Sequence, residues 1–445
     1  MPLKIYTCLL RLVAPLLWAY MFVRARRAGG VWQIFSADRF GSYALPWDGE
    51  APVWVHAVSL GETRAAQTLI TQLLARGERV LLTHMTATGR AEGARLFAPE
   101  IAAGRLRQQW IPYDFSGATQ KFMQHYRPRL GILIEREVWP NLIESAQLAA
   151  VPIVLASARF SEKSHKQVKQ IDRVFLTLMR DTYAGIDLTL AQTEDDATRL
   201  YEVGALNIHV TGNLKFDVSL PAVAVDAGRA WRVRLNRPVI SIASTREGED
   251  ALFVQALARQ ESVALFLLIP RHPQRFDQAA ALLEQAGIAT LRWSALRHNT
   301  QPEQMLAGIK VVLCDTLGEM PFFYAASDVA IVAGSFVPVG GQNLIEACAL
   351  GTPVIVGPHT YNFSEAVANA VAIGAAAQIQ LTEPLDAAQR AVSMAVFWLQ
   401  DQQGLNEKGR LAREWVGQHT GATARILQQI TELEAARAQT LPTQR

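Results

Sequence analysis

The amino-acid sequence predicts an α/β fold class, with two doubly wound domains that each contain a parallel sheet. Two observations support this prediction. First, short apolar runs alternate along the chain with stretches of helical periodicity. Parallel strands that are buried on both faces read as such runs, and the alternation indicates right-handed βαβ units. Second, the runs form one series in each half of the chain, so we expect two domains that face each other across a cleft.

The predicted elements follow from these runs. In the first half the strands are Val53–Ala57, Val80–Thr83, Leu130–Ile134, Ile153–Ala156 and Leu188–Ala191. In the second half they are Val239–Ala243, Leu265–Ile269, Val311–Leu313, Val329–Ala333 and Val354–Val356. The helices between them include Thr63–Arg76, Arg90–Phe97 and Ala251–Gln260. A glycine-bearing turn near Lys215–Asp226 marks the divide, so the expected domains are residues 28–217 and 218–435.

The composition is that of a globular protein. Of the 445 residues, 50% are hydrophobic and 19% are charged, which leaves ample apolar surface for two cores. The formal net charge of +3 is too small to indicate a nucleic-acid groove. The three cysteines, Cys8, Cys314 and Cys348, lie far apart, so we expect free thiols in a reducing compartment. The cysteine and histidine spacings suit no metal, and we predict no metal site.

Residues 1–27 are expected to form a membrane anchor. Ile5–Val23 is a run of 19 residues with a single charge, Arg11, and arginines follow at positions 24, 26 and 27. A spanning helix needs about 20 apolar residues, so this helix either spans the membrane or lies in its interface. The arginine cluster would keep the following domain on the cytoplasmic side. The alternative is a buried helix of a soluble protein.

A carboxylate follows the first predicted strand. Glu62 lies in the segment HAVSLGET, residues 56–63, which leads from that strand into a helix. Ligands of open α/β sheets bind at the carboxyl ends of the strands, so Glu62 is expected to face the cleft. There it could accept the proton of an attacking hydroxyl group. The alternative is that it only complements the positive end of a helix.

Two further carboxylates follow the strand that ends at Ile134. Glu135 and Glu137 flank Arg136 in the segment EREVWPN, residues 135–141. On an extended chain the two carboxylates would share one side while Arg136 points away. Like charges in one site would raise the pKa of one of them. The alternative is a solvated loop.

Cationic and glycine-rich segments complete the candidate site. Lys215, in TGNLKFD near the domain divide, could neutralise charge on a leaving phosphate, or it is a surface lysine. Arg271, in PRHP, ends a strand, and its guanidinium suits phosphate oxygens. DTLGE, residues 315–319, follows another strand, and GGQNLIE, residues 340–346, runs into a helix whose start could bind an anion. Each segment could instead be a polar loop that caps its strand.

These six segments, in this order, resemble those of the Kdo (3-deoxy-D-manno-octulosonic acid) transferases of lipopolysaccharide synthesis. The likeness extends from the N-terminal helix to about Gly421. It implies a GT-B fold, in which two Rossmann-like domains enclose the active site. It further implies inverting transfer of Kdo from CMP-Kdo, a co-substrate, to a lipid A precursor of the lipid IVA type, without a cofactor or metal, at the cytoplasmic face of the inner membrane. The alternatives are a UDP-sugar glycosyltransferase or epimerase of the same fold, and a membrane-tethered binding protein without activity.

The resemblance also implies roles for individual residues. Glu62 matches the general base, and Glu135 and Lys215 match positions that stabilise the transition state. The chain departs from the usual family pattern at Arg136, where a small hydroxylated residue is common, and at Gln342. Arg136 could alter the acceptor site, or it could pair with Glu135 or Glu137 and depress the pKa of that carboxylate. Leu344 is also unusual, since many members have proline there. The segments that resemble the CMP site contain Pro270, Arg271, Leu317, Gly318, Glu319, Asn343, Leu344, Ile345 and Glu346.

Overall fold

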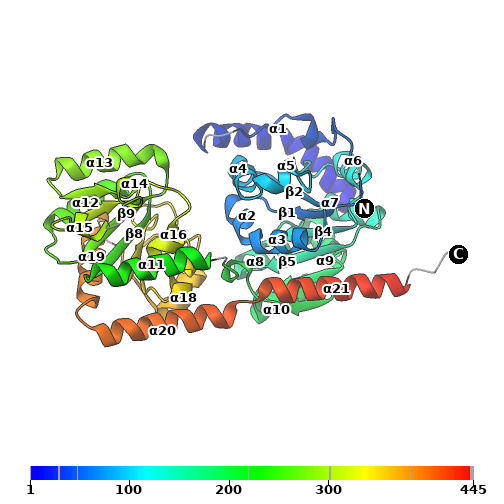
Figure 1. Ribbon diagram of the computed structural model, residues 1–445. Helices are drawn as coiled ribbons and strands as arrows, with labels where there is room; N and C mark the ends of the chain where they lie inside the picture. Colours follow the sequence, from blue (N-terminus) through cyan, green and yellow to red (C-terminus); the bar gives the residue numbers. More distant parts are fainter. Residues whose placement is uncertain are drawn as a thin grey trace. The chain divides into compact units, whose positions relative to one another are not determined.

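The computed structural model describes residues 2–28, 31–47, 49–218, 220–299, 302–381 and 383–440 (Figure 1). They form two compact units. The first contains the chain up to Asp217 together with the residues from His419 onward, and the second is Val218–Gln418. Each unit contains one sheet of seven parallel strands. The predicted α/β class with two doubly wound sheets is confirmed, and the cleft between them stays a prediction.

The sheet of the first unit has the strand order β3-β2-β1-β4-β5-β6-β7. The chain adds β2 and β3 on one side of β1 and then returns to add β4 on the other, so the topological switch point lies between β1 and β4. Val53 and Val55 of β1 belong to the apolar cluster on one face and Trp54 to that on the other, as a doubly covered strand requires. The strands are β1 (Val53–His56), β2 (Val80–His84), β3 (Leu106–Trp110), β4 (Leu130–Ile134), β5 (Ile153–Ala158), β6 (Leu188–Ala191) and β7 (Ile208–Val210).

Helices follow most of these strands. The predicted helix Thr63–Arg76 is divided at Ala66 into α2 and α3, and the predicted helix Arg90–Phe97 begins earlier, because Thr86 caps it. Gly89 lets that helix pack closely on the turn after β1, since a Cβ atom there would lie 2.9 Å from a backbone oxygen of the turn. The helices are α2 (Leu60–Ala65), α3 (Gln67–Ala75), α4 (Ala87–Leu96), α5 (Ala98–Ala102), α6 (Ser116–Tyr126), α7 (Pro140–Leu148), α8 (Glu162–Phe175), α9 (Leu178–Ala184) and α10 (Glu194–Glu202), with 3-10 turns η1 (Ala37–Phe40) and η2 (Leu214–Phe216).

The C-terminal helix α21 (Ala422–Thr440) belongs to the first unit. The Asp217 carboxylate accepts hydrogen bonds from the backbone N–H groups of Gly421 (2.6 Å) and Thr423 at the start of the helix. Ile426, together with Leu427 and Ile430, joins the apolar core of the first unit. The expected second domain of residues 218–435 is therefore too long at its C-terminal end.

The N-terminal helix α1 (Pro2–Ala28) is attached to the first unit by side-chain contacts. Near its start, the Tyr6 hydroxyl donates to an oxygen of Asp114 (3.0 Å), and the Thr7 hydroxyl donates to the side-chain oxygen of Asn141 (2.8 Å). Further along, the ring of Trp18 contacts four aromatic rings of the same unit, those of Phe35, Phe40, Tyr113 and Phe115.

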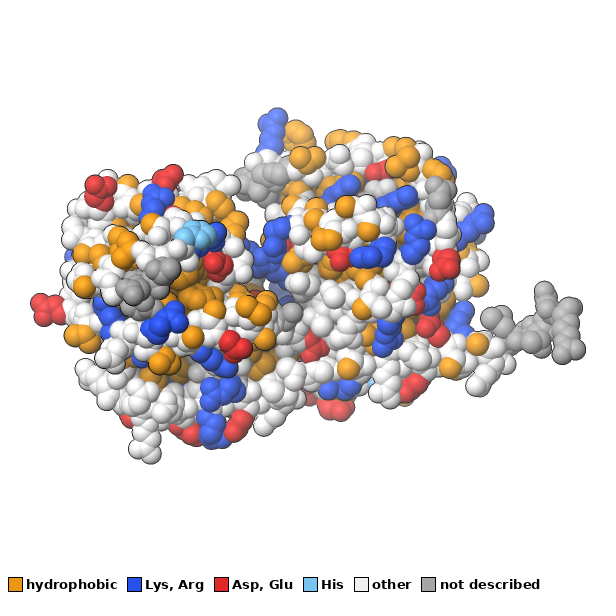
Figure 2. Space-filling view, in the orientation of Figure 1, with side chains coloured by type: hydrophobic (Ala, Val, Ile, Leu, Met, Phe, Trp, Pro, Cys, Tyr) orange, Lys and Arg blue, Asp and Glu red, His pale blue; other side chains and the backbone are white. Residues whose placement is uncertain are grey.

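Most of α1 is nevertheless exposed. The helix is long and apolar enough to cross a membrane, with a mean hydropathy of 1.6, and 11% of its most apolar window is buried. In Figure 2 hydrophobic side chains (orange) and Lys and Arg side chains (blue) project at the upper edge of the first unit, where α1 lies in Figure 1. A core helix of a soluble protein would be largely covered. The predicted N-terminal apolar helix is therefore confirmed, and the alternative of a buried helix does not fit.

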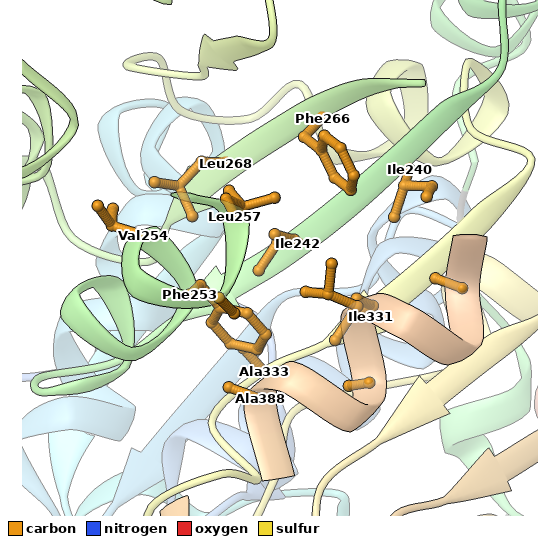
Figure 3. Packing of buried hydrophobic residues seen from close by; sticks show 14 of the residues in the cluster. Ile240, Ile242, Phe253, Val254, Leu257, Phe266, Leu268, Ile331, Ala333 and Ala388 are labelled. Carbon is orange, nitrogen blue, oxygen red and sulfur yellow. The ribbon is translucent and has the colours of Figure 1, made fainter. Parts of the chain in front are cut away.

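The sheet of the second unit has the strand order β10-β11-β9-β8-β12-β13-β14, with its switch point between β8 and β12. Figure 3 shows its core, in which Phe253 of α12 lies near Ala333 and Ala388, beneath the isoleucines of β8 and β12.

The strands of the second unit are β8 (Val239–Thr245), β9 (Leu265–Pro270), β10 (Thr290–Arg292), β11 (Val311–Leu313), β12 (Val329–Val332), β13 (Val354–Val356) and β14 (Ala376–Gln378). Its helices are α11 (Ala222–Leu235), α12 (Glu249–Arg259), α13 (Phe276–Gln285), α14 (Trp293–Leu296), α15 (Pro302–Met305), α16 (Met320–Ala325), α17 (Ile345–Leu350), α18 (Ser364–Ala372), α19 (Pro384–Trp398) and α20 (Gln402–His419), with one 3-10 turn, η3 (Pro273–Arg275).

Candidate active site

Glu62 lies at the switch point of the first unit, in the first turn of α2. Ser59 caps this helix, and the two residues form a capping box: the Ser59 hydroxyl accepts from the Glu62 N–H (3.4 Å), and Glu62 Oε2 accepts from the Ser59 N–H (3.3 Å). The same oxygen accepts a second hydrogen bond, from the Val58 N–H (2.6 Å). Glu62 Oε1 makes no hydrogen bond within the described part of the chain. The backbone thus fixes one oxygen of the carboxylate and leaves the other available.

The surroundings of Glu62 make it a stronger base than an ordinary glutamate. Burial raises the pKa of Glu62, and the negative charge of Glu135 raises it further. The hydrogen bonds from Val58 and Ser59 oppose this shift but do not cancel it. A carboxylate whose pKa is closer to neutrality accepts a proton from a hydroxyl group more readily. The capping role and the basic role therefore coexist in one residue.

Glu135 and Lys215 are brought together in a direct ion pair. Lys215 Nζ lies 2.7 Å from Glu135 Oε1, and the two side chains are 21% and 12% exposed. Glu135 directly follows β4, the strand adjacent to β1, so the pair lies at the same switch point as Glu62. The backbone of Glu135 is left-handed (φ 62°), a conformation that costs about 1–3 kcal/mol in a residue with a side chain and that concentrates at functional sites.

A chain of polar side chains, which the sequence did not indicate, fixes the backbone at Lys215. The Asn213 side-chain oxygen accepts from the Lys215 N–H (2.9 Å), and its amide nitrogen donates to Gln192 (3.0 Å). Gln192 in turn donates to the carbonyl oxygen of Ser157 (2.9 Å), which lies in the irregular end of β5. Only the asparagine belonged to a recognised segment. Ser157 lies in β5 and Gln192 directly follows β6, and only the folded chain brings them to this segment.

Glu137 is a third carboxylate of this cluster. It accepts a hydrogen bond from the Trp139 indole N–H (3.2 Å), and burial, followed by the charge of Glu62, raises the pKa of Glu137 to about 7. Arg136 is exposed and forms no ion pair with Glu135 or Glu137, both of which the structure describes, so the possible pairing is not formed. Its charge nevertheless opposes the rise in the pKa of Glu137. The expected extended segment is wrong, because the left-handed Glu135 turns the chain.

The segments predicted to bind CMP lie at the carboxyl edge of the sheet in the second unit. Pro270 ends β9, and the Arg271 N–H donates to the carbonyl oxygen of Thr245 at the end of β8 (3.0 Å). Gly318 is left-handed (φ 85°), as the turn after β11 requires. Glu319 follows it and accepts from the Trp293 indole N–H (3.2 Å). Because β11, β9 and β8 are neighbours, these segments share one edge of the sheet.

The last predicted segment, 343–346, surrounds the start of α17. The Asn343 side-chain oxygen accepts from the Ile345 N–H (3.0 Å), and its amide nitrogen lies 3.4 Å from an oxygen of Glu346. Leu344 and Ile345 are 0% and 1% exposed, so their side chains are not available to a ligand. Within the described part of the chain, no three His, Cys, Asp or Glu side chains are placed to hold a metal ion.

Comparison with known proteins identifies the class and then the family. Residues 36–218 match the family model described as 3-Deoxy-D-manno-octulosonic-acid transferase (kdotransferase). The chain is 52% identical over 431 residues to the 3-deoxy-D-manno-octulosonic acid transferase of Bordetella pertussis, covering 95% of this chain and 97% of the relative. It is 30% identical to the Haemophilus influenzae enzyme of the same name, covering 95% and 96%.

A solved structure of UDP-GlcNAc 2-epimerase from Neisseria meningitidis superimposes with a TM-score of 0.52 at 14% identity, covering 86% of this chain and 100% of that one. This likeness concerns the fold alone. The fold and the relatives together define a glycosyltransferase of the GT-B type, with two Rossmann-like domains. More specifically, the chain belongs to the 3-deoxy-D-manno-octulosonic acid (Kdo) transferase family.

Proposed function

We propose that this protein transfers Kdo from CMP-Kdo to a lipid A precursor of the lipid IVA type in lipopolysaccharide synthesis, with inversion at the anomeric carbon. The relatives that cover nearly its whole length support Kdo as the transferred sugar and support the reaction class. The observation that carries the mechanism is the carboxylate of Glu62, which the backbone holds by one oxygen at the switch point. Glu62 is therefore assigned as the general base.

In the proposed reaction, Glu62 acts through its available oxygen, Oε1. This oxygen takes the proton of an acceptor hydroxyl group while the hydroxyl oxygen of the acceptor forms a bond to the anomeric carbon of Kdo. The bond between this carbon and the phosphate oxygen breaks, and CMP departs with the electron pair. Attack and departure on opposite faces of the carbon invert its configuration. Neither a metal nor a covalent enzyme intermediate is needed for this balance of atoms and charge.

We assign Lys215 and Glu135 to electrostatic stabilisation. The positive charge of Lys215 stabilises the negative charge on the departing phosphate, and Glu135 holds the ammonium group in position. Asn213 fixes the backbone of Lys215, and the ion pair is already formed, so little reorganisation is needed when charge develops. The donor is assigned to the second unit, at Arg271 and the segments after β11 and before α17.

We propose that α1 lies in the membrane interface, on the cytoplasmic side of the inner membrane, rather than spanning the bilayer. At about 100° per residue, one stripe of the helix holds Thr7, Ala14 and Trp18, which contact the first unit. The opposite face is apolar. Leaving the unit to span a bilayer would break the contacts of this stripe, whereas lying flat keeps them. The outward face contains Ile5, Leu9, Leu12, Leu16, Tyr20 and Val23, which are 44%, 42%, 75%, 72%, 63% and 48% exposed.

The proposed reaction is tested by incubating the purified protein and a lipid IVA-type acceptor with CMP-Kdo, or with UDP-GlcNAc in a parallel sample. Mass spectrometry of the lipid should show the addition of Kdo with the first donor and no addition with the second. Release of CMP should match the Kdo transferred. Transfer from the UDP-sugar, or an unmodified lipid in both samples, would exclude the proposed function.

A further inference from the structure

Arg246 is a cation at the switch point of the second unit that none of the recognised segments contains. It follows β8 directly, and its N–H donates to Glu249 Oε2 (2.7 Å). The same oxygen accepts from the N–H of Gly334 (2.7 Å), which follows β12 closely. Glu249 therefore ties together the two strand ends that flank the switch point. Gly334 is left-handed (φ 72°), and a Cβ atom there would lie 2.9 Å from Gln342 Cγ, so this turn after β12 requires glycine.

The Arg246 side chain is oriented by a histidine. Its Nη1 lies 2.8 Å from Nε2 of His272, which follows Arg271 after β9. Burial, followed by the charges of Arg246, Arg271 and Arg275, lowers the pKa of His272, so the ring is neutral at pH 7. A neutral ring can accept the N–H of the guanidinium at Nε2 if it carries its own proton on Nδ1. The histidine thus positions the arginine without neutralising it.

Arg246 has no acidic partner. It is only partly exposed, and no carboxylate of a described residue lies within 4.0 Å of its guanidinium nitrogens. The neighbouring Arg275 differs, because it pairs with the buried Asp250. A guanidinium without a counter-ion is available to bind an anionic ligand at this position. Ligands of doubly wound sheets bind at the switch point, where Arg246 lies.

The proposed donor carries two anions that suit two neighbouring strand ends. In CMP-Kdo the phosphate ester and the sugar carboxylate are both attached to the anomeric carbon. Arg271 follows β9 and Arg246 follows β8, and adjacent strands lie about 4.8 Å apart. The segment with Arg271 is assigned to CMP, which leaves the second cation for the second anion. The planar guanidinium can bind both oxygens of a carboxylate at once.

We propose that Arg246 binds the carboxylate of the donor sugar, so that the enzyme selects an activated 2-keto sugar acid over an activated neutral sugar. This inference rests on the proposed function. It adds a residue that determines donor specificity, and it assigns His272 the role of positioning that residue. Neither residue takes part in proton transfer.

The inference is tested with the Arg246→Gln variant by measuring KM for CMP-Kdo and the inhibition constant of CMP in the same transfer assay. CMP lacks the carboxylate and reports on the nucleotide and phosphate contacts alone. KM should rise by about tenfold or more, as expected for one lost charge-assisted hydrogen bond, while the inhibition constant of CMP changes less than about twofold. Arg246→Lys should recover part of the loss. Arg259→Gln, an exposed arginine at the end of α12, is the matched control and should change neither constant.

Each other outcome has a defined meaning. An equal rise in both constants would place Arg246 on the phosphate and overturn the inference, and so would two unchanged constants. If Arg246→Gln fails to fold, the ratio of KM for CMP-Kdo to the inhibition constant of CMP is measured in His272→Asn and Arg246→Lys instead. A ratio that is unchanged in both variants would refute the assignment. Failure of the wild-type protein to transfer Kdo or to bind CMP would instead refute the proposed function itself.

Discussion

The Glu62→Gln substitution separates the catalytic role of this residue from its structural role. The glutamine side-chain oxygen can accept the same two hydrogen bonds from the N–H groups of Val58 and Ser59, so the capping box is retained. The ability to take a proton is lost. Turnover should therefore fall by about 100-fold or more, the contribution expected of a general base.

The stability of the variant should not fall with its activity. Burial and Glu135 raise the pKa of Glu62, so its ionised form opposes folding at pH values above that raised pKa. The stabilising contribution of Glu62 to the free energy of unfolding is therefore present at low pH and is lost as the pH rises. A neutral amide removes this penalty, and the free energy of unfolding at pH 7 should be equal or higher. In contrast, Glu62→Ala loses the capping bonds and should be less stable by about 1 kcal/mol.

Both effects are measured on the same three proteins. Initial rates of Kdo transfer give kcat, and denaturant unfolding followed by circular dichroism gives the free energy of unfolding. The expected pattern is low activity in both variants and reduced stability in Glu62→Ala alone. Near-normal turnover by a folded Glu62→Gln enzyme would refute the assignment of Glu62 as the base. A marked loss of stability in that variant would refute the description of its hydrogen bonds.

Three further predictions follow from the first unit. Burial and the charge of Glu62 raise the pKa of Glu137 to about 7, and the ionisation of Glu137 should strengthen Glu62 as a base. We therefore expect kcat/KM to rise through about pH 7 in the wild type but not in Glu137→Gln. The same rise in both proteins would contradict this role of Glu137. Lys215→Gln should lower turnover about 100-fold, and it should lower stability by about 1–3 kcal/mol because a largely buried Glu135 loses its partner. Adding Glu135→Gln should restore the stability but not the activity. Recovery of activity in the double variant would refute the electrostatic role of Lys215. Leu12→Ser combined with Leu16→Ser should weaken binding to vesicles with anionic lipids by about tenfold or more at unchanged Tm, whereas unchanged binding would reject an interfacial α1.

The sequence predicted the inner strands of both sheets and missed the outer ones. The strands that were not predicted are β3, β7, β10 and β14, and these are the four edge strands. An inner strand such as β4 is covered on both faces and must be apolar throughout, whereas the edge strand β3 reads LRQQW and is only partly buried. Edge strands carry polar residues, which also discourage pairing with other chains. The apolar-run criterion therefore fails at the edges for a physical reason.

The candidate site shows a similar division. The short segments containing Glu62, Glu135 and Lys215 were recognisable because the residues of each are neighbours in the chain. The left-handed turn at Glu135 and the support of Lys215 through Gln192 were not, because they depend on groups that meet only in the folded unit. The return of α21 to the first unit likewise depends on contacts between residues about two hundred positions apart, such as those of Asp217.

The anomeric configuration of the newly attached sugar provides the most direct test of a single displacement assisted by Glu62. NMR spectra of the donor and of the lipid product, recorded after one round of transfer, give the configuration at the anomeric carbon before and after reaction. One displacement with one base predicts the opposite configuration in the product. Retention of the donor configuration would require a second displacement or a different mechanism, and it would contradict the role proposed for this carboxylate.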